Sequence, residues 1–256
     1  MQNFKQTAVI AAKEAGRALK ENLGKNHIIE MKGALDIVTE MDMYVEDLII
    51  KRLKHAFPEH GILTEESDEQ KATSGYRWII DPLDGTTNYA HAYPVFCVSI
   101  ALEKDGDVIL GVVYNPMLDE LFISEKGGGA YLNDKKIQVS NVKDVNTSLL
   151  ATGFPYDIRT SSNNNISHFS NFAVRSQAIR RAGSAALDLC YLACGRFDGF
   201  WELKLKPWDV AAASLIIKEA GGALSDFKGG QFSIHYPETL ASNGLIHQQM
   251  LEVLNL

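Results

Sequence analysis

Apolar side chains recur at helical spacing in two stretches near the N-terminus, which predicts two amphipathic helices. The first is expected over residues 3–22, where Gly24 then ends the helix. The second is expected over residues 39–57, and Pro58 follows its last turn. The intervening stretch, residues 24–38, is polar, and we expect a mobile connection there. The chain is therefore expected to begin with a pair of helices.

From residue 61 onward the apolar residues come in short runs bounded by turn residues, a pattern typical of β-strands. The runs lie at 61–67, 77–81, 95–103 and 107–115. The polar residues 103–107 predict a hairpin turn between the last two runs. Another hairpin is expected at 121–134, turning at residues 127–129. That glycine run could instead suggest a phosphate loop, but it lacks the Lys-Ser/Thr ending and a following helix.

The second half of the chain mixes both periodicities. Strands are expected at 148–154, 176–181 and 197–203, and helices at 166–174, 184–194 and 207–222. The last helix carries the strongest signals, because Pro207 opens it and a glycine pair ends it. Residues 159–165 are expected to form a polar loop. These elements predict a mixed α/β (α+β) fold, and the length suits either one large domain over residues 1–256 or two tightly joined halves of about 1–145 and 146–256.

Composition and charge narrow the class of protein. The 256 residues are 46% hydrophobic and 22% charged, which is ordinary for a globular protein. No apolar run approaches the roughly 18 residues that a membrane span needs, so no membrane partner is expected. The net charge of −7 without a basic stripe argues against a nucleic-acid partner. Small phosphorylated ligands remain compatible with this charge, because a metal ion can reverse the local sign of a site.

The cysteines and histidines indicate neither a disulfide framework nor a familiar nucleophile. Three cysteines make no even set, and no signal peptide precedes the first helix, so we expect a reduced, cytoplasmic setting. Cys190 and Cys194 are four residues apart and could share a helix face, where buried small side chains are the simpler interpretation. The seven histidines form no HxH or HExxH pair, and no Cys-x₅-Arg loop is present.

Residues 81–88, DPLDGTTN, place two acids directly after an apolar run. Asp81 and Asp84 would repel each other unless a proton or a cation lies between them. Mg²⁺ takes one or two carboxylates together with waters and substrate phosphate, and the carbonyl of Leu83 could join such a site. Gly85 lets the backbone approach a ligand closely, and the two threonines after it could begin a phosphate-binding turn. An Asx-type turn with a capping threonine explains the same octet.

Other segments carry acids that could complete a ligand set. Glu65 and Glu66 follow a short strand, so we expect one to point inward and one outward, and a solvated acidic loop is the alternative. Asp209 falls in the first turn of the last helix, where an acid also favours the helix dipole. Asp42 stands three residues after Thr39 and matches a capping box. Each acid thus has both a structural and a metal-binding interpretation.

The sequence resembles the inositol monophosphatase family of Mg²⁺-dependent, lithium-sensitive phosphatases. The resemblance covers nearly the whole chain and is carried by two specific signatures, WIIDPLDGTTNY (78–89) and KPWDVAAASLIIKEAGG (206–222). Supporting segments are KGALDIVTEMD (32–42), TEES (64–67), TGFPYD (152–157) and RAGSAALDLCYLACGRFDGFWELKLKPWD (181–209). Many members have Gly where this chain has Thr64. The resemblance implies a layered αβαβα sandwich of the inositol monophosphatase and fructose-1,6-bisphosphatase type, and usually a homodimer.

The resemblance also implies roles for the acids. Glu65, Asp81 and the carbonyl of Leu83 would hold a first Mg²⁺. Asp81, Asp84 and Asp209 would hold a second, and Glu65 would touch a third, weaker ion. Phosphate monoesters hydrolyse extremely slowly without a catalyst. Bound cations lower the pKa of water and screen the ester oxygens, so hydrolysis can proceed without a covalent intermediate.

The remaining implied roles concern water and substrate. Thr86, hydrogen-bonded to Asp42, would help Glu65 orient and deprotonate the attacking water. The backbone amides of Gly85 and Thr86 would bind the phosphate. The other residues implied to contact the substrate are Asp84, Gly183, Ser184, Ala185, Glu202 and Asp209. Lys32 would lie near a mobile loop at the mouth of the site and help to close it.

The substrate is less narrowly defined than the chemistry. Glu202 resembles the family residue that binds a sugar-alcohol hydroxyl, which favours inositol 1-phosphate. Relatives with the same metal site cleave fructose 1,6-bisphosphate, histidinol phosphate, NADP or 3′-phosphoadenosine 5′-phosphate. Some bacterial relatives act on the transcription machinery through protein contacts, which gives a regulatory alternative. A calcium-stabilised structural domain is a third hypothesis, although no EF-hand loop is present. His91, just after the octet, could line the pocket or face solvent.

Overall fold

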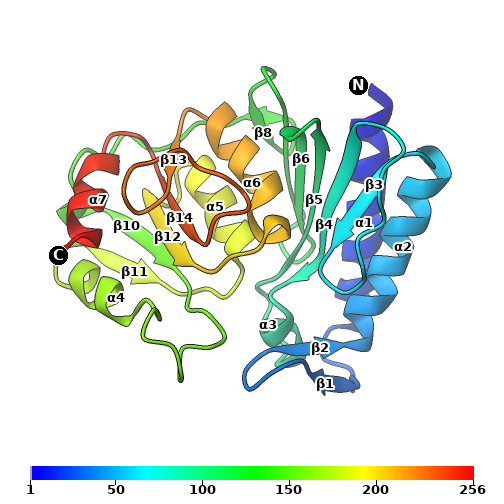
Figure 1. The fold of residues 1–256 in the computed structure, drawn as a ribbon, viewed down its shortest axis with the longest axis horizontal. Helices are drawn as coiled ribbons and strands as arrows, with labels where there is room; N and C mark the ends of the chain where they lie inside the picture. The colour runs from blue at the N-terminus through cyan, green and yellow to red at the C-terminus, as the bar shows by residue number, and fades with distance from the viewer. Residues whose placement is uncertain (1) are drawn as a thin grey trace.

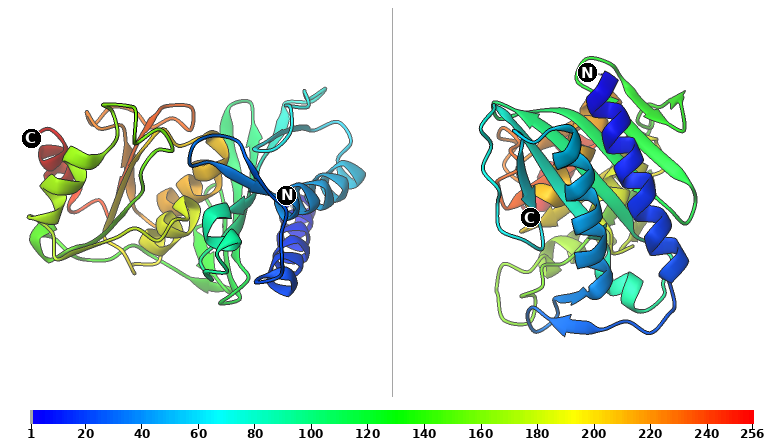
Figure 2. Two further views of the ribbon diagram at one scale, coloured as in Figure 1. Left: turned by 90° about the horizontal axis from the view of Figure 1, so that it is seen from below. Right: turned by 90° about the vertical axis from the view of Figure 1, so that its right-hand side faces the viewer.

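The first half of the chain forms a seven-stranded sheet covered by two long helices (Figure 1). The computed structural model describes residues 2–256. Helices α1 (Gln2–Asn22) and α2 (Glu40–Ala56) pack side by side on one face of the sheet (Figure 2). The strands follow one another across the sheet in chain order: β3 (Gly61–Thr64), β4 (Tyr76–Asp84), β5 (Cys97–Lys104), β6 (Asp107–Asn115), β7 (Glu120–Glu125), β8 (Ala130–Leu132) and β9 (Lys135–Lys136). Strands β3 and β4 are parallel, and the remaining neighbours are antiparallel.

The second half forms a five-stranded sheet, which follows a short 3₁₀ helix at Val145–Thr147. The strands lie in the order β11 (Ala178–Arg180), β10 (Leu149–Thr152), β12 (Gly199–Leu203), β14 (Glu238–Ser242) and β13 (Ala223–Ser225). Helices α5 (Ala185–Ala193) and α6 (Pro207–Glu219) lie between the two sheets, and α4 (Ile166–Ala173) and α7 (His247–Leu254) cover the outer face (Figure 1). The expected αβαβα sandwich is therefore confirmed.

Small apolar side chains set the spacing of the helical layers. The face of α1 that meets the sheet is fully buried and rich in alanine: Ala8, Ala11, Ala12, Ala15 and Leu19. Helix α6 is apolar nearly all round, with Ala211, Ala212, Ala213, Ile216 and Ile217 in the central core. A helix of this composition is typical of a fully buried position. Helix α6 occupies such a position, and Asp209 lies in its first turn.

Gly111 of β6 lies directly against α6. A Cβ atom there would stand 2.4 Å from the carbonyl oxygen of Ala212. Gly111→Ala should therefore push α6 away from the sheet and destabilise the fold by about 1–3 kcal/mol, which corresponds to a fall in melting temperature of about 2–12 °C. Calorimetry of Gly33→Ala is the control, because the nearest atom to that Cβ is 3.7 Å away. Equal melting temperatures for the two variants would contradict this packing.

Most elements expected from the periodicity are present, including both hairpin turns. The polar connection contains an unexpected antiparallel hairpin of β1 (Ile29–Met31) and β2 (Ile37–Thr39). All three residues of β1 are exposed, so this strand has no buried face and leaves no alternating pattern in the sequence. Within residues 2–256, no helix combines the length and apolarity needed to cross a bilayer.

Candidate active site

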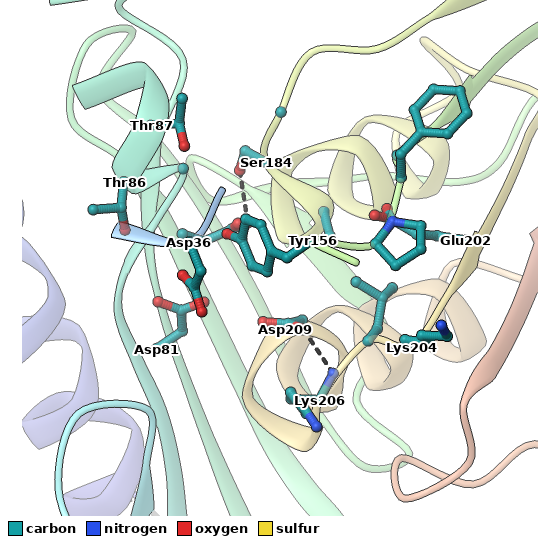
Figure 3. Close-up of a pocket in the computed structure, with 18 of the residues that line it drawn as sticks. Asp36, Asp81, Thr86, Thr87, Tyr156, Ser184, Glu202, Lys204, Lys206 and Asp209 are labelled. Carbon is teal, nitrogen blue, oxygen red and sulfur yellow. Dashed lines mark hydrogen bonds between the residues drawn. The ribbon is translucent and has the colours of Figure 1, made fainter. Parts of the chain in front are cut away.

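A cavity of about 440 Å³ opens between the two halves of the molecule, next to the first turns of α5 and α6 (Figure 3). Its walls come from six separate parts of the sequence: residues 32–36, 65, 81–88, 152–157, 181–188 and 202–209. The quoted family segments all contribute to it. Sequence-distant acids are thus brought to one place by the fold, as the sequence interpretation required.

Asp81 and Asp84 lie at the buried end of β4. Asp81 Oδ1 accepts a hydrogen bond from the Leu83 amide at 3.0 Å. The pairing of β4 with β5 shifts register between Asp81 and Asp84, and such an irregularity re-aims side chains. Asp84 Oδ2 accepts hydrogen bonds from Ser184 Oγ and the Ala186 amide, both at 2.7 Å. Each carboxyl group is thus anchored through one oxygen.

The octet continues into the short helix α3 (Thr86–Ala90). Gly85 precedes it with φ of 106°, and a Cβ there would lie 2.9 Å from the carbonyl oxygen of Val95. Glycine adopts this positive φ without strain, and it has no Cβ atom that would clash with the Val95 carbonyl. Asn88, which the sequence interpretation missed, donates to the carbonyls of Val95 at 2.7 Å and Ala182 at 2.9 Å. It ties the octet to the segment that precedes Gly183.

Asp42 serves both of the roles considered for it. Its Oδ2 accepts a hydrogen bond from the Thr39 amide at 2.8 Å and completes the capping box of α2. Its Oδ1 accepts a hydrogen bond from the Thr86 hydroxyl at 2.9 Å. The carbonyl of Leu83 lies 3.1 Å from the same hydroxyl. Helix capping and contact with the octet are therefore compatible in one side chain.

Glu65 borders the cavity, but the expectation for its neighbour is wrong. Glu66 does not point outward: its side chain is 3% exposed and pairs with Lys32 Nζ at 2.5 Å. Lys32 Nζ also lies 3.3 Å from Glu65 Oε1. The segment turns inward because buried Glu46 of α2 accepts hydrogen bonds from Thr64 Oγ1 at 2.7 Å and the Glu66 amide at 3.0 Å. Glu46 was missed, since an acid on a helix normally indicates an exposed face.

Asp209 closes the cavity from the side of α6 (Figure 3). Its Oδ2 accepts a hydrogen bond from the Lys206 amide at 2.7 Å, so the helix-capping interpretation holds. The carbonyl of Trp208, beside it, accepts a hydrogen bond from Ser99 of β5 at 3.3 Å. This contact fixes the start of α6 against the sheet that carries Asp81.

The four cavity acids repel one another. Burial, with repulsion from the neighbouring carboxylates, raises the pKa of Glu65 to about 8 and that of Asp81 well above its usual range. Burial also raises the pKa of Asp84, and it raises the pKa of Asp209 to about 8. Lys32 opposes the increase in the pKa of Glu65, because its positive charge favours the ionised carboxylate. It is the only cation among the causes of that pKa shift. A cation bound here would therefore stabilise the ionised acids.

The donor set suits a hard divalent cation. Within residues 2–256, the hydrogen bonds to Asp81 and Asp209 all go to one oxygen of each carboxyl group, so Asp81 Oδ2 and Asp209 Oδ1 are left for another partner. Carboxylate and carbonyl oxygens are the ligands that Mg²⁺ prefers. Within this part of the chain, no three His, Cys, Asp or Glu side chains are placed so that they could hold one metal ion together. An open set is still compatible with Mg²⁺, because this ion keeps several waters and binds substrate phosphate.

The raised pKa values predict an unusual pH dependence of stability without metal. Unfolded carboxyl groups ionise near pH 4, whereas Glu65 and Asp209 have folded pKa values of about 8. Between these values the folded state binds more protons, so the free energy of unfolding should fall as pH rises. Melting in a chelator at pH 6 and pH 8 measures this. Glu65→Gln should reduce the fall, and an unchanged slope in that variant would contradict the assignment.

The residues implied to contact the alcohol share the cavity with the acids, and one of them, Ser184, donates a hydrogen bond to Asp84. Gly183, Ser184, Ala185 and Glu202 all line it. Glu202 reaches it because Gly153 leaves room: a Cβ at residue 153 would stand 2.0 Å from Glu202 Oε1. Burial raises the pKa of Glu202 to about 8. His91 is exposed and does not line the cavity.

Several cavity residues were not predicted. They include Asp36 and Tyr156, which are drawn close together in Figure 3, as well as Arg181, Asp188, Lys204 and Lys206. Burial, with repulsion from Asp36 and from the cavity acids, raises the pKa of Tyr156. The segment TGFPYD contains Tyr156 and supported the resemblance, so its position could have been inferred from that motif.

Comparison with known proteins identifies relatives over the full chain. A sequence model described as the inositol monophosphatase family matches residues 1–255. An inositol-1-monophosphatase of Mesorhizobium japonicum is 42% identical over 249 residues, which is 96% of this chain and 94% of that protein. The Nus factor SuhB of Salmonella typhimurium is 41% identical over 247 residues, 95% of this chain and 92% of that protein. The crystal structure of the extragenic suppressor protein suhB from Bartonella henselae has a TM-score of 0.92 and 40% identity, covering 97% of each chain.

Fold, cavity and relatives together define a phosphoric monoester hydrolase. The chain belongs to the inositol monophosphatase family. Members of this family act on small phosphorylated substrates, use divalent metal ions and are sensitive to lithium.

Proposed function

We propose that the chain catalyses Mg²⁺-dependent hydrolysis of inositol 1-phosphate by activated water, without a covalent intermediate. The observation that carries this proposal is the group of four carboxyl groups on the cavity wall, of which Asp81 and Asp84 are buried and Glu65 and Asp209 are partly exposed. These acids need a cation to stay ionised, and a phosphate ester needs cations to react. One bound group would satisfy both requirements.

Two or three Mg²⁺ ions would be held by five donors: Glu65, Asp81, the carbonyl of Leu83, Asp84 and Asp209. When bound, Mg²⁺ provides Lewis acidity, which lowers the pKa of water and offsets charge on the ester. The backbone anchors of Asp81, Asp84 and Asp209 fix one oxygen of each carboxyl group. Such anchoring favours a preorganised site, because the ligands lose less freedom when the ion binds.

Thr86, Asp42 and Glu65 would handle the attacking water. The Thr86 hydroxyl donates its hydrogen to Asp42, so its oxygen is left to accept a hydrogen bond from water. Glu65 stands on the turn held by Glu46, at the same cavity. Burial raises the pKa of Glu65 to about 8, so a cation beside it would be needed to keep it ionised as a proton acceptor near neutral pH. Together the three side chains would orient water and remove its proton.

The two ends of the substrate would contact different elements. The amides of Gly85 and Thr86, at the start of α3, would bind the phosphate. The alcohol would lie against Gly183, Ser184, Ala185 and Glu202. Asp84 and Asp209 would border the substrate between these ends. Lys32 would help to close the cavity, since it already bridges Glu65 and Glu66 from the β1–β2 hairpin connection.

Three wider expectations accompany this proposal. The chain would act as a single domain over residues 1–256, because both halves contribute to the cavity. It would form a homodimer, as is usual in the family. It would work in the cytoplasm without nucleic-acid or membrane partners, which agrees with its net charge of −7.

A phosphate-release panel with Mg²⁺ tests the substrate. The panel contains inositol 1-phosphate, fructose 1,6-bisphosphate, histidinol phosphate, NADP and 3′-phosphoadenosine 5′-phosphate. The highest kcat/KM is expected for inositol 1-phosphate, because Glu202 provides a carboxyl group for a ring hydroxyl. A higher value for another substrate would replace inositol 1-phosphate with that compound while leaving the reaction class unchanged. No release from any substrate would contradict the proposal.

A second candidate is a regulatory role through protein contacts. It is supported by the 41% identity to a protein named Nus factor SuhB. This role does not require loss of catalysis, since the acid set is complete in this chain. Co-purification with RNA polymerase, compared between the wild type and a catalytically inactive Asp84→Asn variant, separates the two functions. Equal recovery of the polymerase from both proteins would support an independent regulatory role.

A further inference from the structure

Asp188 lies on the cavity side of α5, away from the metal-ligand acids in sequence. Its amide donates to the carbonyl of Ser184 at 3.1 Å, so the two residues are one helical turn apart. Asp188 is 2% exposed, yet it belongs to the cavity lining. Ser184 already contacts Asp84, whereas no role in the reaction has been given to Asp188.

The carboxyl group of Asp188 lacks hydrogen-bond partners. Its Oδ1 is inaccessible and unpaired, and no donor within residues 2–256 reaches its Oδ2. Other buried acids are well satisfied: Asp198 accepts from Ser140 Oγ and the Leu149 amide, and Asp84 accepts from Ser184 Oγ and the Ala186 amide. An unpaired buried carboxyl destabilises a fold, so its retention calls for a functional explanation.

The neighbours of Asp188 do not remove this deficit. Asp84 is the acid that repels Asp188, and it keeps its own hydrogen bonds to Ser184 and Ala186. Glu202, which Asp188 repels in turn, also has no hydrogen-bond donor within the described residues. Arg181 acts on both acids at longer range, but it donates to neither. The alcohol end of the cavity therefore presents two carboxyl groups that lack donors. A ligand with several hydroxyl groups carries the complementary donors.

We propose that Asp188 is a specificity-determining residue that, together with Glu202, accepts hydrogen bonds from the hydroxyl groups of a polyol phosphate. This inference rests on the proposed function for the orientation of the substrate and extends it to a residue that had no role. The favoured ligands are uncharged polyols esterified with one phosphate. A second anionic group at this end would meet two acids and bind less well.

The test compares Asp188→Leu with Asp198→Leu. Leucine has a similar shape to aspartate but accepts no hydrogen bond. Asp188→Leu should keep or raise the melting temperature, because it removes an unpaired buried carboxyl. Asp198→Leu should lower the melting temperature, because it leaves two buried donors without an acceptor. A residue with a purely structural role at position 188 would behave like Asp198.

Substrate preference provides the second measurement. Inositol 1-phosphate and phenyl phosphate share the phosphate, but only the first has hydroxyl groups on its alcohol. Asp188→Leu is expected to lower kcat/KM for inositol 1-phosphate by about tenfold, the value of one hydrogen bond. The value for phenyl phosphate should stay within about twofold of the wild type. Equal losses on both esters, or no loss on either, would overturn the role of Asp188.

A calorimetric measurement of inositol 1-phosphate binding tests the role of Asp188 separately from the proposed catalytic function. Absence of phosphate release by the wild type would count against the proposed function alone. The inference on Asp188 is then decided by binding: weaker binding to Asp188→Leu than to the wild type supports it. Equal binding by both proteins, or no binding by the wild type, refutes it.

Discussion

Asp84→Asn is expected to lower kcat for phosphate release by about three orders of magnitude. A metal ion contributes several kcal/mol to transition-state stabilisation, and about 1.4 kcal/mol corresponds to each tenfold change in rate. The fold should survive, because the asparagine carbonyl can still accept from Ser184 Oγ and the Ala186 amide. Loss of one negative charge also reduces repulsion among the cavity acids. Steady-state kinetics and melting curves measure the two effects.

Asp198→Asn is the matched control for this variant, since Asp198 is a buried acid outside the cavity lining. It should lower the melting temperature and leave kcat close to the wild-type value. Wild-type turnover by Asp84→Asn would remove Asp84 from the catalytic site. An unfolded Asp84→Asn variant would contradict the structural part of the account.

Removal of divalent metal should have the largest effect of all. Phosphate release is expected to cease in EDTA and to return when excess Mg²⁺ is added, because no protein group replaces the cation. Mg²⁺ at about 100 times its dissociation constant should stabilise the folded state by about 2.7 kcal/mol. This corresponds to a rise in melting temperature of about 5–11 °C for a chain of this size.

The Asp81→Asn variant is the control for the effect of Mg²⁺ on the melting temperature. This variant should gain much less stability from Mg²⁺ than the wild type, because Asp81 is implied in both main metal sites. Full activity in EDTA would reject the metal mechanism. An identical Mg²⁺-dependent stabilisation of Asp81→Asn and the wild type would locate the bound ion elsewhere.

The octet 81–88 shows how far the sequence could be interpreted. Alone it was compatible with either a turn or a metal site, and the structure contains features of both, because Gly85 begins a short helix beside two cavity acids. The same duality applies to Asp42 and Asp209, which cap helices and reach the cavity. Local patterns predicted the caps. Their convergence depended on the tertiary arrangement of segments distant in sequence.

The missed features lack a local signal. Glu46 is buried because it receives hydrogen bonds from Thr64 and Glu66, which approach it only in the folded chain. Asp188 resembles any acid in a first helical turn until its missing partners are counted. The β1–β2 hairpin could not be predicted from the sequence either, because β1 is fully exposed and therefore shows no alternation of apolar and polar residues. Hydrophobic periodicity predicts which helices and strands form the layers of the fold. Hydrogen bonds between polar side chains of different layers can be identified only in the structure.

The most direct test of the central claim locates the metal. Crystals of the chain soaked in Mn²⁺ should give anomalous-difference peaks at about 2.1 Å from carboxylate oxygens of Asp81, Asp84 and Asp209. A second peak is expected beside Glu65, Asp81 and the carbonyl of Leu83. The account predicts that the peak shared by Asp81, Asp84 and Asp209 disappears in Asp84→Asn crystals together with activity. Mn²⁺ bound only elsewhere, in crystals that still release phosphate, would contradict it.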